Sequence, residues 1–216
     1  MKNRETFIAE LSKNLAPVKR MPSVNLFAVS WFIVSAVYVV IVMHLFGPIR
    51  PGALSQLISS PRFLLETLLG VAAIFWVSLL AFRDAVPGAL SRRFMIGGFI
   101  MMTLWLSQYV IGIVSPALEP STLGKRDLCG YETMLYSLPP IYLAWFLVRR
   151  FYPLHPMRTA MSISLASGMI PALYMQIACM YDPSHILKFH ITPGLLMVLI
   201  GVAIAWYWQP INKQRV

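Results

Sequence analysis

The chain has few of the residues from which most enzyme active sites are built. Among its 216 residues it contains only two cysteines, four histidines and eight acidic residues. It has no Cys-x-x-Cys pair, no His-Glu-x-x-His motif, no phosphate-binding P-loop and no Gly-x-Ser-x-Gly nucleophile elbow. These absences argue against the common metal-, nucleotide- and serine-dependent enzymes. We therefore expect no cofactor.

Hydrophobic residues, by contrast, are abundant. They make up 58% of the chain, whereas a soluble globular domain is roughly 45–50% apolar. A membrane-spanning helix needs about 20 mostly apolar residues. Six such stretches occur, at residues 25–46, 63–82, 94–114, 131–148, 159–180 and 189–209. The sequence therefore predicts an all-α, polytopic membrane protein with six transmembrane helices and loops too short to form a second domain.

Positive charges indicate how these helices are oriented. If the loops alternate sides, 13 of the 18 Lys and Arg residues fall on one side. Lys and Arg in short loops favour the cytoplasmic side of a membrane. We therefore expect a cytoplasmic segment at residues 1–24, a membrane domain at 25–209 and a cytoplasmic tail at 210–216. A bacterial inner membrane is the simplest location for such a chain. The net charge of +10 lies beside the spans, so we expect contact with lipid headgroups and no direct contact with nucleic acid.

Acidic residues are almost absent from the interior of the apolar stretches. Glu66 is the only one well inside a predicted span, and Arg62 stands one helical turn before it. We expect the Glu66 side chain either to reach the membrane interface or to pair with Arg62. A transporter would usually carry several polar groups near the middle of the membrane. A small transporter therefore remains an alternative that this scarcity disfavours.

Small residues and prolines predict how the helices pack. Ala160, Ser164, Gly168 and Ala172 recur at every fourth position, which lets another helix approach closely. Gly201 and Ala205 offer a shorter version of the same pattern in the last span. Prolines at positions 139, 140, 171 and 193 remove amide donors, so we expect them to face neighbouring helices or a cavity.

A short amphipathic helix is predicted before the first span, at residues 3–15. Such a helix is marginal alone in water and needs a surface to rest on. Two interpretations remain open and are compatible: the helix lies on the membrane surface, or it docks a cytoplasmic partner. Its apolar face consists of Phe7, Ile8, Leu11 and Leu15.

The two cysteines are predicted to lie near the outer face. Cys129 precedes the fourth span and Cys179 ends the fifth. In an oxidising compartment they could form a structural disulfide, or they could act as a redox- or metal-responsive pair. A quinone-linked membrane thiol oxidoreductase is a further alternative. Such an enzyme usually has a second cysteine pair to relay electrons, which this chain lacks.

Histidines add a further hypothesis at the same face. His185 and His190, with Asp127 and Asp182, could join the cysteines in a site for a soft metal. Their spacing, however, matches no standard zinc pattern. We therefore expect no bound metal, with Cys129, Cys179 and His190 as the candidate ligands if one is present.

Several short motifs, taken in order, resemble those of one family. They are Ala16-Pro17-Val18-Lys19-Arg20, Ser60-Pro61-Arg62-Phe63, Val86-Pro87-Gly88, Cys129, Ser137-Leu138-Pro139-Pro140, Arg149-Arg150 with Pro153-Leu154 and Pro156, and Cys179 with Asp182. Each motif is short, but their order and spacing cover essentially the whole chain. The chain resembles the NrsF-type membrane anti-sigma factors, which restrain an extracytoplasmic-function sigma factor.

The resemblance implies a regulator and not an enzyme. Its cytoplasmic part would hold the sigma factor at the membrane, and heavy-metal or oxidative stress acting on Cys129 and Cys179 would release it. A change at the cysteines would alter the packing of the fourth and fifth spans, where prolines allow bending, and would reach residues 149–158. The residues expected to contact the sigma factor are Phe7, Ile8, Leu11, Leu15, Lys19 and Arg20.

Overall fold

The computed structural model describes residues 2–13, 23–151 and 153–213. In chain order the elements are α1 (Lys2–Lys13), α2 (Val24–Phe46), α3 (Ala53–Ser59), α4 (Pro61–Asp84), α5 (Arg92–Val114), α6 (Cys129–Val148), the 3₁₀ helix η1 (Arg149–Phe151), α7 (Pro156–Ala178), α8 (Pro183–Ile186), the π-helix η2 (Leu187–Ile191) and α9 (Thr192–Lys213). Extended structure in these ranges is limited to one isolated antiparallel bridge between Ser121 and Tyr181. The predicted all-α class is confirmed.

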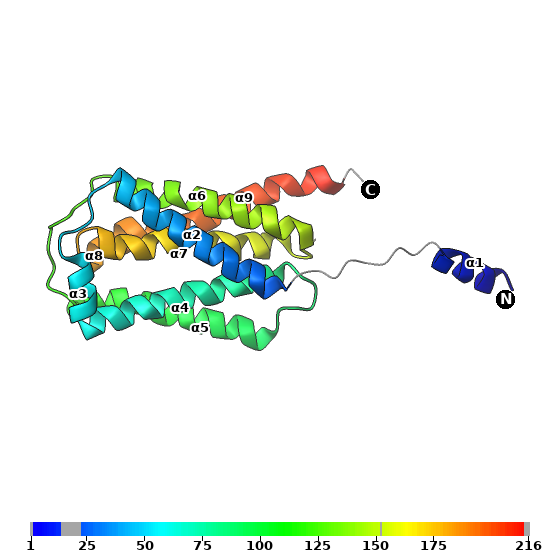
Figure 1. The fold of residues 1–216 in the computed structure, drawn as a ribbon, viewed down its shortest axis with the longest axis horizontal. Helices are drawn as coiled ribbons and strands as arrows, with labels where there is room; N and C mark the ends of the chain where they lie inside the picture. The colour runs from blue at the N-terminus through cyan, green and yellow to red at the C-terminus, as the bar shows by residue number, and fades with distance from the viewer. Residues whose placement is uncertain (1, 14–22, 152, 214–216) are drawn as a thin grey trace.

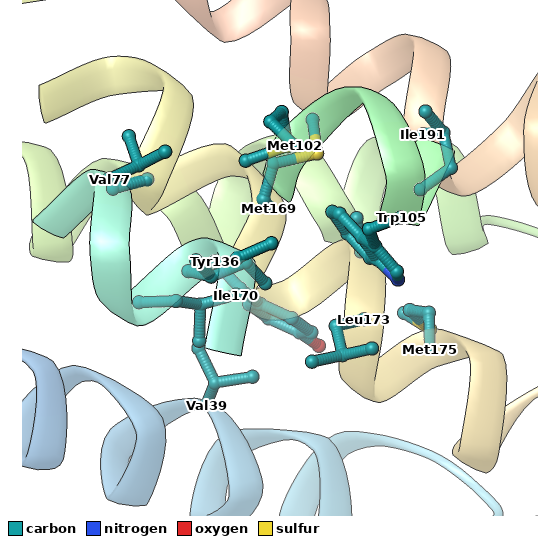
Figure 2. Packing of buried hydrophobic residues seen from close by; sticks show 14 of the residues in the cluster. Val39, Val77, Met102, Trp105, Tyr136, Met169, Ile170, Leu173, Met175 and Ile191 are labelled. Atoms are coloured by element: carbon teal, nitrogen blue, oxygen red, sulfur yellow. The ribbon is translucent and has the colours of Figure 1, made fainter. Parts of the chain in front are cut away.

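The long helices α2, α4, α5, α6, α7 and α9 lie side by side in one bundle (Figure 1). α7 is the central helix, because it packs against α9, α4, α6 and α2. In its most apolar stretch 72% of the residues are buried, compared with 22–39% in α2, α4, α5 and the segment Pro183–Tyr207. Figure 2 shows side chains of α7, among them Met169 and Leu173, pointing into the core beside Trp105 of α5.

The outer helices turn large apolar side chains away from this core. Phe99 is 73% exposed and Val114 is 89% exposed. Five helical segments are long and apolar enough to cross a membrane by length and composition: Val24–Phe46, Pro61–Asp84, Arg92–Val114, Pro156–Ala178 and Pro183–Tyr207. Apolar surface on this scale favours a lipid environment over water.

The remaining predicted span corresponds to α6, which is not among these five. Glu132, three tyrosines and the pair Pro139-Pro140 reduce its hydropathy, although the helix is 20 residues long. It nevertheless packs against α7, α9 and α2 within the bundle (Figure 1). Crossing of a membrane by α6 therefore stays a prediction.

A helix does approach the small-residue stripe closely, as predicted, and the structure shows that this helix is α9. Ala160, Ser164, Gly168 and Ala172 are all buried in α7. A Cβ atom added to Gly194 of α9 would lie only 2.8 Å from the carbonyl oxygen of Gly168. Because neither glycine carries a side chain, the two backbones meet directly.

The prolines also lie largely where the sequence predicts. Pro140, Pro171 and Pro193 are buried between helices, whereas Pro139 is exposed. The indole nitrogen Nε1 of buried Trp31 donates a 2.9 Å hydrogen bond to the carbonyl oxygen of Pro140. This bond joins α2 to the part of α6 that contains Pro139 and Pro140. Here a side chain of a neighbouring helix donates to a backbone carbonyl.

The bundle has two distinct ends. α3, α8 and the connection between α5 and α6 lie at one end, which we call the capped end (Figure 1). The start of α2, the end of α9 and the connections after α4 and α6 lie at the other, which we call the open end. Cys129 and Cys179 are at the capped end.

Candidate functional site

Four potential metal ligands meet at the capped end. They are Cys129, Cys179, His185 and His190, and their sulfur and nitrogen ligand atoms all lie within 4.8 Å of one another. We call this group the thiol–imidazole cluster. Its members come from the start of α6, the residue after α7, and the consecutive elements α8 and η2. Residues 50 positions apart in sequence thus become neighbours because α6 and α7 pack against each other.

Backbone and hydroxyl hydrogen bonds hold the two cysteines in place. The Cys179 amide donates to the carbonyl of Met175 at 2.9 Å, which closes the last turn of α7. Next to it, the Arg50 amide donates to the carbonyl of Ala178 at 2.8 Å, so the segment before α3 is tied to the end of α7. At the other cysteine, the Thr133 hydroxyl donates to the carbonyl of Cys129 at 2.8 Å.

Asp182 positions His185. Its carboxylate oxygen Oδ1 accepts hydrogen bonds from the amides of Ser184, at 2.8 Å, and His185, at 3.3 Å, and from the Ser184 hydroxyl. This is the N-cap arrangement that starts a helix, and Pro183 occupies the first helical position that proline favours. Burial opposes ionisation of Asp182, but the Ser184 hydrogen bonds outweigh it and lower the pKa of this carboxyl. The cap therefore stays ionised near neutral pH.

The π-helix η2 positions His190. In an α-helix, residues five apart point about 140° away from each other. A π turn closes with hydrogen bonds between residues five apart, and here the Thr192 amide donates to the carbonyl of Leu187. The Thr192 hydroxyl donates to the same carbonyl at 2.8 Å. The wider turn brings His190 back toward His185, whose ring centre lies 5.1 Å from that of His190.

Contacts within the cluster are close and shielded from solvent. His185 Nε2 lies 3.4 Å from Cys129 Sγ and 3.7 Å from Cys179 Sγ. Cys179 and His190 are fully buried, and Cys129 is 2% exposed. Both thiols are free, with no disulfide between them. Neither ring nitrogen of His190 has a hydrogen-bond partner within the described part of the chain.

The cluster departs from the sequence-based hypothesis in its membership. Asp182 serves as the helix cap, and Asp127 is not part of the group. His185, which we did not retain among the candidate ligands, contacts both thiols. The sequence does contain one indication of the role of His185. The Asp182-Pro183 pair predicts the start of a helix, and that helix would orient His185.

The predicted pairing of Glu66 is confirmed. Arg62 Nε lies 3.0 Å from Glu66 Oε1, and Arg62 also donates to the Ser115 hydroxyl at 3.1 Å. A second ion pair at the capped end joins buried Arg126 to Glu132 at 2.7 Å, and Arg126 donates to the carbonyl of Pro48 as well. These pairs give Glu66 and Glu132 structural roles that link loops to helices.

The residues expected to contact a sigma factor are described only in part. Phe7 and Ile8 lie in α1 and are 61% and 56% exposed, so the described chain leaves both largely uncovered. The side chain of Leu11, and Leu15, Lys19 and Arg20 as a whole, lie outside the described residues.

Sequence reasoning missed a buried carboxylate at the open end. The Asp84 side chain is fully buried, and its oxygen Oδ2 accepts a 2.8 Å hydrogen bond from the Thr159 hydroxyl. Its other oxygen pairs with half-exposed Arg158. This group joins the end of α4 to the start of α7, the helix whose other end carries Cys179. In sequence, Asp84 resembles an ordinary loop residue next to Arg83.

Comparison with known proteins gives one family match. No curated protein and no solved structure matches the chain. One protein-family description, NrsF, negative regulator of sigma F, matches residues 11–208. Because that match covers most of the sequence, the chain belongs to the NrsF family of negative regulators of a sigma factor.

Proposed function

We propose that this protein is a membrane-bound anti-sigma factor of the bacterial inner membrane. It holds an extracytoplasmic-function sigma factor at the cytoplasmic face and releases it when Cys129 and Cys179 respond to heavy-metal or oxidative stress. The main observation in support is that both thiols lie in one buried cluster at one end of a helical bundle. Family membership supports the regulatory role.

Charge supports the proposed orientation. The open end carries basic residues such as Arg83, Arg149 and Arg158, and the bundle's described chain ends lie there too (Figure 1). If the chain has six spans, the positive-inside tendency favours a cytoplasmic location for this end. Residues 1–24 and 210–216 then share a compartment with the sigma factor, and the thiol–imidazole cluster faces the envelope.

The exposed apolar residues of α1 support a docking role. Phe7 and Ile8 lie side by side on a short helix that the described chain does not cover. A groove of the sigma factor could bury them in the helix-in-groove mode. The alternative resting place, the headgroup region of the membrane, is available when the sigma factor is absent.

α7 connects the two ends. Cys179 follows its last residue, while Thr159 and Arg158 contact Asp84 near its first turn. A change in the cluster that moves α7 would thus act on the α4–α7 contact at the cytoplasmic end. To convert a mostly bound partner to a mostly free one, the signal must supply about 5.5 kcal/mol of differential stability.

Co-purification tests the holding function. We expect an extracytoplasmic-function sigma factor of the source organism to co-purify with the full chain from membranes, and to be lost when residues 1–24 are removed. A Phe7→Ser, Ile8→Ser double variant should weaken the complex, whereas Glu10→Gln on the same helix should not. Equal recovery with and without residues 1–24 would show that the docking segment is wrongly assigned.

A transcription reporter tests the sensing function separately. Cys129→Ser or Cys179→Ser should change how target transcription responds to cadmium or peroxide, while the protein still reaches the membrane. An unchanged response in both variants would reject the cysteines as sensors and leave the holding function intact.

A further inference from the structure

We propose that Cys129, Cys179, His185 and His190 form a four-coordinate binding site for a thiophilic divalent metal ion such as Zn²⁺. The role of this ion in regulation rests on the proposed anti-sigma function. The binding of the ion does not depend on that function, because it is inferred from the thiol–imidazole cluster alone. The proposal extends the pair of cysteines to a complete ligand set in which both histidines take part.

The donor atoms select the class of metal. Two thiolate sulfurs and two imidazole nitrogens suit Zn²⁺ and similar borderline or soft ions, and four such ligands are typical of tetrahedral structural sites. Hard cations such as Mg²⁺ and Ca²⁺ prefer oxygen ligands. The nearby carboxylate of Asp182 is engaged by the amides and hydroxyl of its helix cap, so the cluster offers sulfur and nitrogen.

Distances within the cluster match a tetrahedral ion. With Zn–S bonds of about 2.3 Å and Zn–N bonds of about 2.0–2.1 Å, ideal tetrahedral angles separate sulfur and nitrogen ligands by about 3.6 Å. The two sulfur–nitrogen distances from His185 Nε2 are 3.4 Å and 3.7 Å. All remaining ligand pairs lie within 4.8 Å, so small side-chain movements close the site around an ion.

The burial of His190 is a second indication of a bound metal ion, separate from the distances. Its ring is fully buried, and neither nitrogen finds a hydrogen-bond partner within the described part of the chain. A buried polar group without a partner destabilises the folded state. A metal bond would give one of the two nitrogens a partner. The π turn that delivers His190 to the cysteines belongs to a class of helix irregularity often found at functional sites.

A full ligand set makes the site closed. Four protein ligands leave no open coordination position, which is the arrangement of structural and sensing sites and not of catalytic ones. The ion would bond the start of α6, the end of α7 and the α8–η2 segment to one centre. Because the same sulfurs cannot form a disulfide while they bind a metal, metal occupancy and disulfide formation exclude each other. Metal binding is thereby linked to the thiol chemistry of the proposed sensor.

Cobalt binding to the purified protein tests the site. The full chain in detergent is reduced, stripped with a chelator and titrated with Co²⁺ alone. We expect one Co²⁺ per chain, with the intense visible bands of four-coordinate cobalt and a thiolate-to-cobalt charge-transfer band in the near ultraviolet. Zn²⁺ should displace Co²⁺ and abolish both signals.

Variants identify the ligands. His185→Ala and His190→Ala should each weaken binding by at least about tenfold, since even outer-shell changes at metal sites cost 10–100-fold. Cys129→Ser and Cys179→Ser should each reduce the charge-transfer band. His44→Ala is the matched control, because His44 lies at the same end but is exposed and bonds the carbonyl of Val40. Gel filtration and thermal unfolding of each variant check folding. If His190→Ala misfolds, half-buried His185 supplies the histidine test.

The outcomes separate the two proposals. Absence of Co²⁺ binding, the weak spectrum of six-coordinate cobalt, or equal affinity in the His185, His190 and His44 variants would each overturn the metal site. Formation of a Cys129–Cys179 disulfide without any metal binding would also overturn it, and would leave redox sensing standing. Sigma-factor co-purification is measured on the same preparations, so loss of the anti-sigma function is detected independently of metal binding.

Discussion

At the scale of single residues, His185 and Asp182 show how one side chain can set the geometry of another. The Asp182 carboxylate bonds the His185 amide and so fixes where α8 begins. The imidazole of His185 then reaches both cysteines. A short helix of this kind has almost no stability of its own, so its cap has an unusually direct effect on the cluster.

Replacing the cap tests this dependence. Asp182→Ala should lower the free energy of unfolding by about 1 kcal/mol and weaken Co²⁺ binding, because the amides of Ser184 and His185 lose their acceptor. Asp182→Asn should retain most of the affinity, since asparagine caps helices about as well as aspartate. Thermal unfolding and Co²⁺ titration measure the two effects. Equal Co²⁺ affinity in Asp182→Ala and the unmodified chain would show that the cap does not position His185.

The pKa of Asp182 also gives this contribution a pH dependence. Because folding lowers the pKa, the stabilisation is fully present above the carboxyl's unfolded value. It is lost as the pH falls through the lower, folded value. We therefore expect the Asp182→Ala and unmodified proteins to converge in stability in acid.

At the scale of helices, α7 and α9 approach each other so closely that their backbones are in contact. Gly168 and Gly194 face each other, and Ser164 faces Gly201 one to two turns away. Such contacts hold helices together by close packing in lipid, where the hydrophobic effect between helices is weak. They also fix α9 and η2, and therefore His190, relative to the end of α7.

A single methyl group tests this contact. Gly168→Ala places a Cβ against the carbonyl of Gly194, and overpacking of this kind costs typically about 1–3 kcal/mol. Gly130→Ala in α6 is the control, because its Cβ would meet Phe189 and Pro193 at ordinary contact distances of 3.4–3.6 Å. Thermal unfolding in detergent should show a lower melting temperature for Gly168→Ala only. Identical melting temperatures would mean that the two helices can move apart without any loss of stability, and that their close contact is not needed.

At the scale of the whole molecule, the bundle separates two chemically different ends. The capped end buries thiols, imidazoles and two arginines, Arg50 and Arg126. The open end carries exposed basic side chains around buried Asp84. Exposed apolar side chains of the long helices lie between them. α7 is a long helix that contacts both the thiol–imidazole cluster, through Cys179, and Asp84, through Arg158 and Thr159.

Compartment-specific labelling tests the orientation. The native thiols are buried and unsuitable, so single cysteines are introduced at exposed Gln56 of the capped end and Ala89 of the open end. A membrane-impermeant maleimide applied to intact cells whose outer membrane is permeabilised should label Gln56→Cys and not Ala89→Cys. The unmodified chain is the background control. Labelling of Ala89→Cys alone would show that the orientation is the reverse of the proposed one, and would contradict sensing at the envelope face.

Much of the architecture was predictable because it depends on local composition. Apolar runs of about 20 residues specify helices wherever backbone groups must bond internally. The small-residue stripe of α7 predicted that a helix would approach it closely, without saying which one, and the four-residue spacing predicted the Arg62–Glu66 pair. Each of these signals lies within one helix and follows from its period.

The sequence by itself determined the long helices, the faces on which they pack and the two thiols as the unusual residues of the chain. Only the tertiary structure decided that His185 and His190 join those thiols and that Asp84 is buried. The reason is physical: a π turn and a contact between distant helices leave no periodic mark in the sequence, so distances across them are set by packing alone.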